Sequence, residues 1–424
     1  MFVFPSFFLD FLGQAISGKD NEFTPVFSYE DFEREAIQGL YEKKQYLGED
    51  GIFTPLLKHF LEKALSAELQ AHLKEEPYNK RNGLSSKRVK SSSGEFDLVT
   101  PRDRTGSFTP EIVSKRQVVV GDDLCEKILS MYGKGMSYND IKKYLSEIYG
   151  LSFSPAQMTE ITDQIIPELE EWQSRPLDQI YAIVWFDAIH YKVKENSRVT
   201  TKALYNVFAV NMEGQRELLG IYVSESESAS FWLSVMQDLQ LRGVEDMLIV
   251  CTDNLKGFSE AISSIFPQTI VQSCIVHQVR NTLKYAARKD YRSLVDDMKA
   301  IYTCAGIEQA EVKLTEFAEK WEEKYPVAVK SWQANWYKLS SFFEFGKDIR
   351  RLMYTTNPIE NVHRQMRKIT KTKGSFSSDM ALKKLIYLVI REINKAPKGK
   401  IPGWGLILSQ LTIKFENRIS LAQK

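Results

Sequence analysis

The hydrophobic pattern changes character at residues 181–194, whose sequence is YAIVWFDAIHYKVK. This run of β-branched and aromatic side chains favours a pleated, buried surface and is too short for a long helix, so it predicts a central strand. Its one carboxylate is Asp187. A buried carboxylate costs several kcal/mol unless it is paired, hydrogen-bonded or bound to a cation. The pattern therefore indicates an acid that is held at a metal site or a reaction site.

Shorter runs after this strand alternate between strand and helix periodicity. We expect strands at residues 203–210, 217–223, 247–250 and 269–273, and helices at residues 230–241, 255–266 and 275–289. A three-strand meander followed by crossovers produces a mixed sheet with helices on its faces. Ligands of such sheets bind at the ends of the middle strands. Asp253 follows one of these strands, so we expect it near Asp187, although an acid in that position is also a common helix cap.

The first 175 residues are mainly helical in pattern. We expect one helix at residues 28–46 and a second from Thr54, where a leucine stripe indicates a core or dimer contact. Three short helices follow at residues 122–132, 137–149 and 156–166. They fit a helix-turn-helix whose last helix presents Gln157 and Thr159 to a major groove. Three-helix packings without DNA are equally common, so this pattern leaves both interpretations open.

Gly, Ser and basic residues dominate between residues 79 and 117. The segment fits either a solvated linker or an arm that contacts phosphates, because clustered Lys and Arg displace counterions from nucleic acid. The alternating pieces GEFDLVTPRD and GSFTPEIV predict a small hairpin within it. As phosphate contacts we select Lys80, Arg81, Lys87, Arg88, Arg102 and Arg104.

The pattern at residues 291–345 is entirely helical and predicts an insertion between the sheet and the following segment TTNPIENVHRQMRKITKTKGSF. In that segment Asn357 is expected to cap a helix, with Pro358 first and Glu360 at the capping-box position. A purely structural role for Glu360 is therefore a serious alternative. The helix continues with His363 and with four cations that suit a phosphate backbone, Arg364, Arg367, Lys368 and Lys371.

Composition adds few constraints. With 424 residues, of which 43% are hydrophobic and 26% charged, the chain is typical of a globular protein of two or three domains. Its net charge of +1 does not indicate what it binds. Four scattered cysteines without a CxxC pair indicate a reducing compartment and no disulfide framework. The opening segment MFVFPSFFLDFLGQAISG carries Asp10 and is too short to span a bilayer, so we expect a packed or docking segment and no membrane association.

Three acids carry the candidate chemistry: Asp187, Asp253 and Glu360. A few carboxylates that hold two divalent ions about 4 Å apart can catalyse phosphodiester chemistry, and Mg²⁺ or Mn²⁺ suits such oxygen ligands. Cys274 and His277 form a CxxH pair, but zinc needs two more ligands and no second pair is suitably spaced. His277 therefore fits a catalytic role in orienting a phosphate or a water, or the role of an interior histidine.

Several long blocks resemble the mutator-type bacterial insertion-sequence transposases. They include WFDAIH, CTDNLKGF, CIVHQVRNTLKY, YPVAVKSWQANW and YTTNPIENVHRQMRKITKTKGSF, and the similarity runs from about residue 54 to residue 415. The resemblance implies an RNase H-like core of the DDE type, with Asp187, Asp253 and Glu360 as catalytic metal ligands and Cys274 and His277 as the family's C-x-x-H motif. It also implies cleavage at terminal inverted repeats and strand transfer, commonly through a circular intermediate. The first fifty residues depart from this similarity.

Our interpretation is an α/β mixed-sheet RNase H-like catalytic core with an all-α insertion, preceded by a mainly helical DNA-binding region. We expect a Mg²⁺-dependent DNA transposase that acts as a homodimer on double-stranded terminal-repeat and target DNA in the bacterial cytoplasm. Two rivals stay open, a structure-selective nuclease on the same fold and a DNA-binding regulator without catalysis. The expected parts are residues 1–50, 51–120, 121–175, 176–290, 291–350, 351–400 and 401–424.

Overall fold

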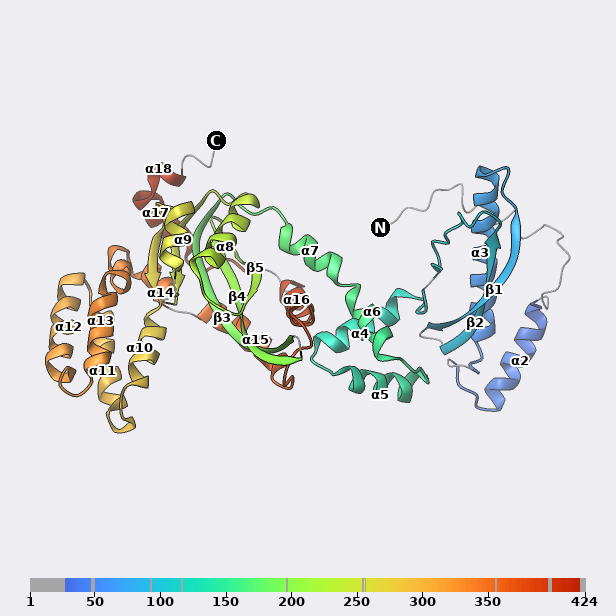
Figure 1. The fold of residues 1–424 in the computed structure, drawn as a ribbon, viewed down its shortest axis with the longest axis horizontal. Coiled ribbons are helices and arrows are strands. Elements are labelled where there is room, and N and C mark those ends of the chain that lie inside the picture. The colour runs from blue at the N-terminus through green and yellow to red at the C-terminus, as the bar shows by residue number, and fades with distance from the viewer. Residues whose placement is uncertain are drawn as a thin grey trace. The chain divides into compact units, whose positions relative to one another are not determined.

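The computed structural model describes residues 27–46, 50–91, 94–115, 117–195, 197–253, 255, 257–354, 357–395 and 399–419, without the side chains of Asp122, Tyr354, Asn357 and Pro358. The predicted docking segment at the start of the chain lies outside these residues, and the capping role expected of the Asn357 side chain lies outside what the structure describes. Two compact units divide the chain between Gln164 and Ile165. Each unit is described by itself below, and Figure 1 shows their elements.

The first unit begins with helices α2 (Tyr29–Tyr41) and α3 (Thr54–Glu75) and a hairpin of β1 (Arg81–Ser91) and β2 (Gly94–Asp103). Leu65 of α3 is buried with Val89 and Leu98 of the hairpin, so the leucine stripe is at least partly a core contact. The predicted hairpin was wrong in its pairing. The partner of β2 is the basic stretch β1, and residues 106–113 form no strand. Residues 106–113 contain Pro110, which lacks the N–H that pairing with a neighbouring strand needs. β1 can pair despite its polar sequence, because one face of an antiparallel sheet can lie in water.

Three short helices follow the hairpin: α4 (Asp122–Gly133), α5 (Tyr138–Tyr149) and α6 (Pro155–Asp163). Their predicted punctuation is confirmed. Ser137 caps α5 in a capping box with Asp140, and Gly150 ends that helix in the left-handed conformation at φ 64°. Ser154 caps α6 in a second capping box, with Pro155 in the first turn.

The second unit contains a mixed five-stranded sheet in the order β5-β4-β3-β6-β7. The antiparallel strands are β3 (Ile180–Glu195), β4 (Arg198–Asn211) and β5 (Arg216–Ser224), while β6 (Asp246–Thr252) and β7 (Ile270–Ser273) run parallel to β3. The predicted meander and crossovers are confirmed. β3 is the middle strand, and the register sets Phe186 beside Thr252 of β6. The residues that follow this pair are therefore close together, Asp187 midway along β3 and Asp253 just after the end of β6.

Helices α7 (Ile166–Ser174), α8 (Ala229–Leu241) and α9 (Phe258–Ile265) lie against this sheet or beside it (Figure 1). Trp232 of α8 is fully buried, with its ring edge-on to Phe186 of β3 at 6.1 Å and to Phe258 of α9 at 5.0 Å. These aromatic contacts join the middle of β3 to α8 and α9. Helix α7 was not among the predicted helices, although Pro167 in its first turn is a favourable start.

Helix α10 (Ile275–Lys284) and the short η1 (Arg288–Asp290) lead into an insertion that is all-helical, as predicted. The insertion consists of α11 (Tyr291–Tyr302), α12 (Ile307–Trp321), α13 (Pro326–Leu339) and η2 (Ser341–Glu344). Its interior includes Leu294, Phe317 and Trp332, all of which are buried. The expected helix at residues 275–289 was therefore too long, and the chain turns after Lys284.

The chain returns to the sheet through α14 (Lys347–Tyr354), α15 (Asn357–Thr370) and α16 (Asp379–Lys395). The tail, which had only a loose pattern, forms α17 (Trp404–Lys414) and α18 (Glu416–Ile419). Trp404 packs so closely on the β4–β5 turn that a Cβ on Gly214 would lie 2.4 Å from the indole ring. No helix among the described residues is long and apolar enough to cross a membrane. No disulfide joins Cys125, Cys251, Cys274 and Cys304.

Candidate functional site

Asp187 extends from the middle strand into a largely buried position. Its side chain is 13% exposed, and Oδ1 accepts a hydrogen bond from the Ala188 N–H at 2.8 Å. Burial, and then the negative charge of the nearby Asp253, raise the pKa of Asp187 to about 6. The carboxylate is therefore held where its own charge is poorly compensated by the protein.

Asp253 follows β6 and contacts the first turns of α10. Its Oδ1 is paired with Nδ1 of His277. Burial works against protonation of His277, but the interactions with Asp253 and Cys274 together outweigh burial and raise the pKa of the imidazole to about 10. At neutral pH His277 is therefore a cation that neutralises Asp253.

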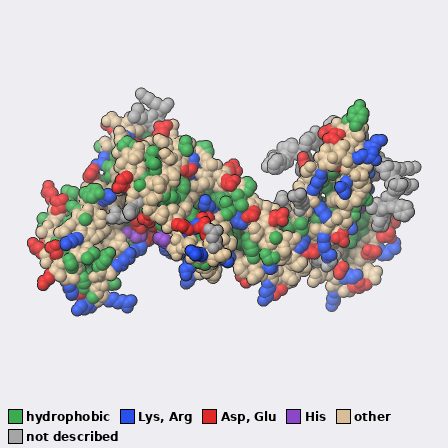
Figure 2. All heavy atoms as spheres, in the orientation of Figure 1, with side chains coloured by type: hydrophobic (Ala, Val, Ile, Leu, Met, Phe, Trp, Pro, Cys, Tyr) green, Lys and Arg blue, Asp and Glu red, His purple; other side chains and the backbone are tan. Residues whose placement is uncertain are grey.

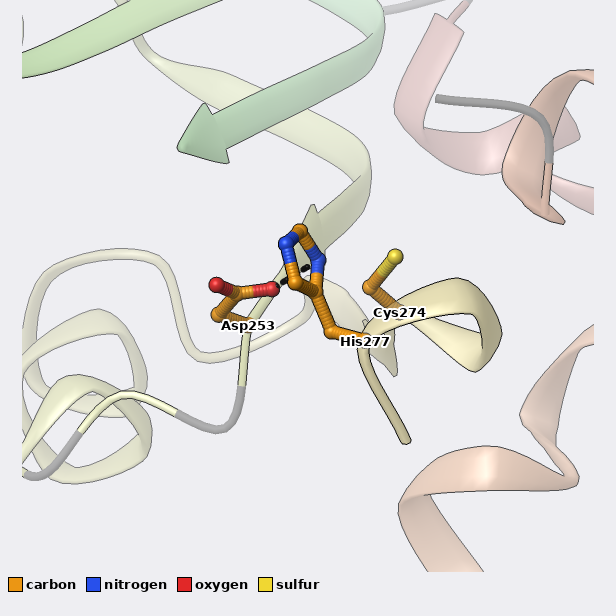
Figure 3. Close-up of side chains that lie close together, drawn as sticks. All are labelled: Asp253, Cys274 and His277. Carbon is orange, nitrogen blue, oxygen red and sulfur yellow. Dashed lines mark ion pairs between the residues drawn. The ribbon is translucent and has the colours of Figure 1, made fainter. Parts of the chain in front are cut away.

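Cys274 completes a small cluster with these two residues. Figure 3 shows Asp253 arriving from the strand end and Cys274 and His277 from the start of α10. One oxygen, one sulfur and one nitrogen atom of this trio lie within 4.8 Å of one another. Sequence spacing alone missed the carboxylate as a partner of the CxxH pair, because Asp253 comes from a different strand. A closed zinc site takes four ligands, and the described residues offer three.

Glu360 lies in the first turn of α15 and its side chain is 38% exposed. Its Oε1 accepts a hydrogen bond from the guanidinium of Arg280 at 2.9 Å. Arg280 belongs to α10 and follows His277 by three residues, so both side chains lie on the same face of that helix. Sequence reasoning did not select Arg280, although the His-x-x-Arg spacing was a readable signal.

His363 follows Glu360 by one helical turn, and we had grouped it with the cations of the basic helix. That grouping was wrong. The imidazole is only 2% exposed, with Nδ1 3.5 Å from Oδ2 of Asp187 and Nε2 3.0 Å from the amide nitrogen of Asn206. Burial and then the charge of Arg367 lower the pKa of His363 to about 3, so it is neutral. An amide nitrogen only donates, so Nε2 accepts and the ring proton on Nδ1 faces Asp187.

The three acids are thus connected through two helices. His363 of α15 contacts Asp187, and His277 of α10 contacts Asp253. The Arg280–Glu360 ion pair joins the two helices. A pocket at this place is lined by Asp187, Asp253 and His277 and by Ile359, the residue before Glu360. Asp187 and Asp253 therefore line one cleft, whereas Glu360 follows a lining residue on α15 and its side chain is paired with Arg280.

Comparison with known proteins identifies the family of the chain. The family described as "Transposase, Mutator family" matches residues 31–397. The chain belongs to the Mutator family of transposases. The transposase is 39% identical to that of insertion sequence element ISRM3 from Rhizobium meliloti (strain 1021), over 89% of this chain and 96% of the relative. It is 27% identical to the IS905 transposase of Lactococcus lactis subsp. lactis (strain IL1403), over 91% of this chain and 99% of the relative.

Transposases act on DNA, so the basic side chains of this transposase are candidate DNA contacts. In its second unit Arg364, Arg367, Lys368 and Lys371 are exposed on or just beyond α15. The opposite side of this helix buries Met366 in the protein. The cations therefore face solvent from the helix that carries Glu360.

In the first unit of the transposase the hairpin register gathers four exposed cations at one end. Arg81 pairs with Asp103 in the ladder, and Lys80, Arg102 and Arg104 are their neighbours. Lys87 and Arg88 lie further along and already have protein partners, the Ser114 carbonyl and Glu95. The four clustered cations are therefore the stronger candidates for phosphate contact.

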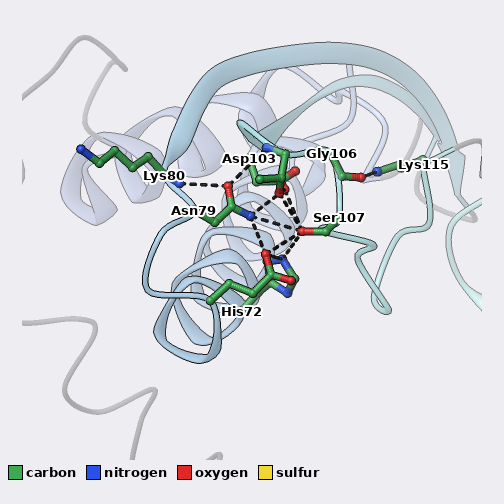
Figure 4. Close-up of polar contacts among 9 residues, drawn as sticks. His72, Asn79, Lys80, Asp103, Gly106, Ser107 and Lys115 are labelled. Carbon is green, nitrogen blue, oxygen red and sulfur yellow. Dashed lines mark hydrogen bonds and ion pairs between the residues drawn. The ribbon is translucent and has the colours of Figure 1, made fainter.

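A polar network fixes this basic end of the hairpin. Figure 4 shows Asp103 at its centre, with Asn79 donating to it at 2.9 Å and Ser107 at 3.1 Å. Thr105 donates at 2.8 Å. Burial opposes ionisation of Asp103, but these hydrogen bonds outweigh it and hold the pKa of that carboxyl well below its usual range. The network joins the end of α3 to the hairpin and the following loop.

The side chains that we selected on α6 have partners within the unit. The side-chain oxygen of Gln157 accepts the N–H of Ser154 at 3.0 Å and lies 3.4 Å from Nζ of the buried Lys90. The hydroxyl of Thr159 donates to the Pro155 carbonyl at 3.1 Å. Any base contact by these two residues would compete with bonds that stabilise the start of α6.

Proposed function

We propose that this transposase binds the terminal inverted repeats of an insertion sequence and catalyses divalent-metal-dependent DNA cleavage and strand transfer on an RNase H-like DDE core. The observation that carries this proposal is the gathering of Asp187, Asp253 and the Glu360-bearing helix around one cleft, where β6 ends beside the middle of β3. Cleavage exposes a 3′-hydroxyl, which then attacks the target strand. This substrate would place the transposase at the nucleoid of the bacterial cytoplasm.

Asp187, Asp253 and Glu360 are the residues that would hold two Mg²⁺ or Mn²⁺ ions. Their carboxylate oxygens are the ligand type that these ions prefer. The raised pKa of Asp187 supports the fit, because it reflects negative charge that a cation would relieve. When bound, such a pair of ions activates the attacking oxygen and stabilises the leaving one.

The neighbours of the acids would orient them. The Nδ1–H of His363 faces Asp187 and points that carboxylate into the cleft. The His277 cation plays the same part for Asp253 and adds positive charge near a scissile phosphate. The guanidinium of Arg280 forms an ion pair with Glu360. Glu360 must therefore turn away from Arg280 before it can bind a metal ion.

DNA would be held by both units. In the first unit we assign phosphate contacts to Lys80, Arg81, Arg102 and Arg104, with Lys87 and Arg88 further along the hairpin. Gln157 and Thr159 of α6 would face the major groove, at the cost of their bonds within the unit. In the second unit we assign phosphate contacts to Arg364, Arg367, Lys368 and Lys371. Contacts of this kind position the duplex without reading its sequence. We further propose that the active form is a homodimer, which suits a substrate with two element ends.

The test is cleavage of duplex DNA that carries the element's own terminal repeat, with Mg²⁺, by single-residue variants. Asp187→Asn, Asp253→Asn and Glu360→Gln should each abolish cleavage and leave binding to that DNA largely intact. Glu308→Gln, an exposed acid on α12, is the matched control and should cleave normally. Normal cleavage by any of the three variants would remove that residue from the proposed site.

The products of the same assay separate the rival functions. A transposase produces joined strand-transfer products, whereas a structure-selective nuclease cuts without joining. A DNA-binding regulator without catalysis would bind the repeat and give no Mg²⁺-dependent nick.

A further inference from the structure

Charge is unevenly divided within the helical part of the second unit. Residues 275–292, which form α10, η1 and the start of α11, contain five cations and one acid. Residues 293–324, which form the rest of α11 and α12, contain four cations and eight acids. Figure 2 shows Lys and Arg side chains gathered around the end of α10. The excess positive charge is therefore confined to residues 275–292, and the acids of the following helices conceal it when the net charge of the whole helical part is counted.

The buried side of α10 fixes which way its cations face. Gln278 donates to Ser331 of α13 at 2.9 Å, and Trp332 of α13 donates to Thr282 at 2.8 Å. Arg280 and Lys284 lie on the other side of α10 and are exposed. They are four residues apart, about 6 Å along the helix axis. The α13 contacts thus hold a row of cations toward solvent.

Most of these cations are not neutralised by nearby acids. Lys284 donates to the neutral side-chain oxygen of Asn281 at 2.8 Å. Within the part of the chain that the structure describes, Lys284, Arg288 and Arg292 form no ion pair. Asp290, the one acid of the segment, is already bound by Lys324 at 2.7 Å. Exposed cations without counter-charges repel one another, which is unfavourable for the free protein. The same cations bind a polyanion favourably.

The row begins at the candidate active site. His277, Arg280 and Lys284 share one face of α10, since their spacing of three and four residues is one helical turn each. His277 contacts Asp253 and Arg280 contacts Glu360. α10 therefore approaches the cleft from the side of Asp253, while α15 approaches it from the side of Asp187 through His363.

We propose that Arg280, Lys284, Arg288, Lys289 and Arg292 form a second track for the phosphate backbone of DNA, here called the α10 track. It leads away from the cleft over the insertion, on the side of the acids that α15 does not occupy. The inference rests on the proposed function, because it takes the cleft as the place where a strand is cut. DNA on one side of the scissile phosphate is held by α15, and DNA on the other side by the α10 track.

The experiment measures the affinity of the full chain for a mixed-sequence DNA duplex as a function of salt concentration, without divalent ions. The variant is Lys284→Gln/Lys289→Gln. Its matched control is Lys299→Gln/Lys313→Gln, which removes the same charge from the exposed Lys299 of α11 and from the partly exposed Lys313 of α12, a lysine that is paired with Glu316. Each lost phosphate contact lowers the slope of log affinity against log salt by about 0.9. For the α10 variant we expect the magnitude of this slope to be smaller than that of the wild type by about 1.8. The control variant should have the same slope as the wild type.

Equal slopes for the two double variants would overturn the α10 track, whether both match the wild type or both fall below it. Unchanged thermal unfolding of each variant shows that the fold is intact. The wild type is also tested for cleavage of the element's own end with Mg²⁺. Failure of that cleavage would count against the proposed function, whereas cleavage together with equal slopes would count against the track alone.

A second measurement locates the track. In the cleavage assay the α10 variant should be weaker than the wild type on a substrate with long duplex on both sides of the cut. Shortening the duplex on one side only should make the two proteins equal, because that shortening removes the DNA that the track would hold. A defect of the α10 variant that persists whichever side is shortened would contradict the assignment.

Discussion

Two buried aspartates in this transposase show opposite behaviour. Asp103, in the first unit, receives hydrogen bonds from the side chains of Asn79, Thr105 and Ser107, and its pKa is lowered. Asp187, in the second unit, receives one backbone hydrogen bond and lies near a second carboxylate, and its pKa is raised to about 6. A carboxylate that the protein satisfies holds a fold together. One that the protein leaves short of positive charge is suited to an external cation.

The strongest way to break this comparison is to remove the charge of Asp187. Asp187→Asn should reduce cleavage by about a thousandfold or more, the scale of losing an electrostatic group that acts in the transition state. It should leave the free energy of unfolding unchanged or slightly higher, because the buried charge is poorly compensated. Cleavage rates and urea unfolding of the same preparation check both parts. Strong destabilisation would mean that Asp187 is structural, like Asp103.

A smaller effect should follow from loosening the support of Asp187. Asn206→Ala removes the amide that holds Nε2 of His363, so the imidazole loses its orientation toward Asp187. Changes to residues that support metal ligands typically cost 10–100-fold, and we expect cleavage to fall by about that factor. The Mg²⁺ concentration for half-maximal cleavage should also rise, which a general folding defect would not produce. An unchanged Mg²⁺ dependence would exclude this positioning role.

For Asp103 the expected loss is of stability. Asp103→Ala leaves the buried Asn79 amide and nearby hydroxyls without their acceptor, which should destabilise the first unit by about 1–3 kcal/mol. Urea unfolding measures this loss. Asp97→Ala, on the same strand but exposed, is the control and should change the stability by less than about 0.5 kcal/mol. Equal losses for the two variants would show that the polar network contributes nothing specific.

The smallest expected effect is a difference in pH dependence. Because the folded pKa of Asp103 is lowered, its stabilising contribution is fully present above the unfolded pKa of about 4 and is lost as the pH falls below that value. The gap in unfolding free energy between the wild type and Asp103→Asn should therefore narrow as the pH is lowered from about 5. A gap that stays constant over this range would contradict a lowered pKa.

Much of the second unit could be predicted because its signals are local. The β-branched run around Asp187, the short apolar strand before Asp253 and the Pro-led helix of Glu360 each specify their own backbone. The first unit was harder to predict. β1 is rich in Ser, Lys and Arg and has no clean hydrophobic alternation, so its pairing with β2 was missed. Its strand conformation depends on a partner, and a polar edge gives little periodic signal.

The sequence by itself determined that one acid lies on a buried strand, that a second follows a strand, that a third begins a basic helix, and that an all-helical segment precedes that helix. It did not determine that Asp187 lies midway along its strand instead of at the end. Only the tertiary structure decided which side chains meet those acids. His363 reads as a surface cation and is a buried neutral imidazole, while Arg280 is paired with Glu360, 80 residues away. Backbone preferences act over a few residues, whereas the burial and charge of a side chain depend on whatever distant segment packs against it.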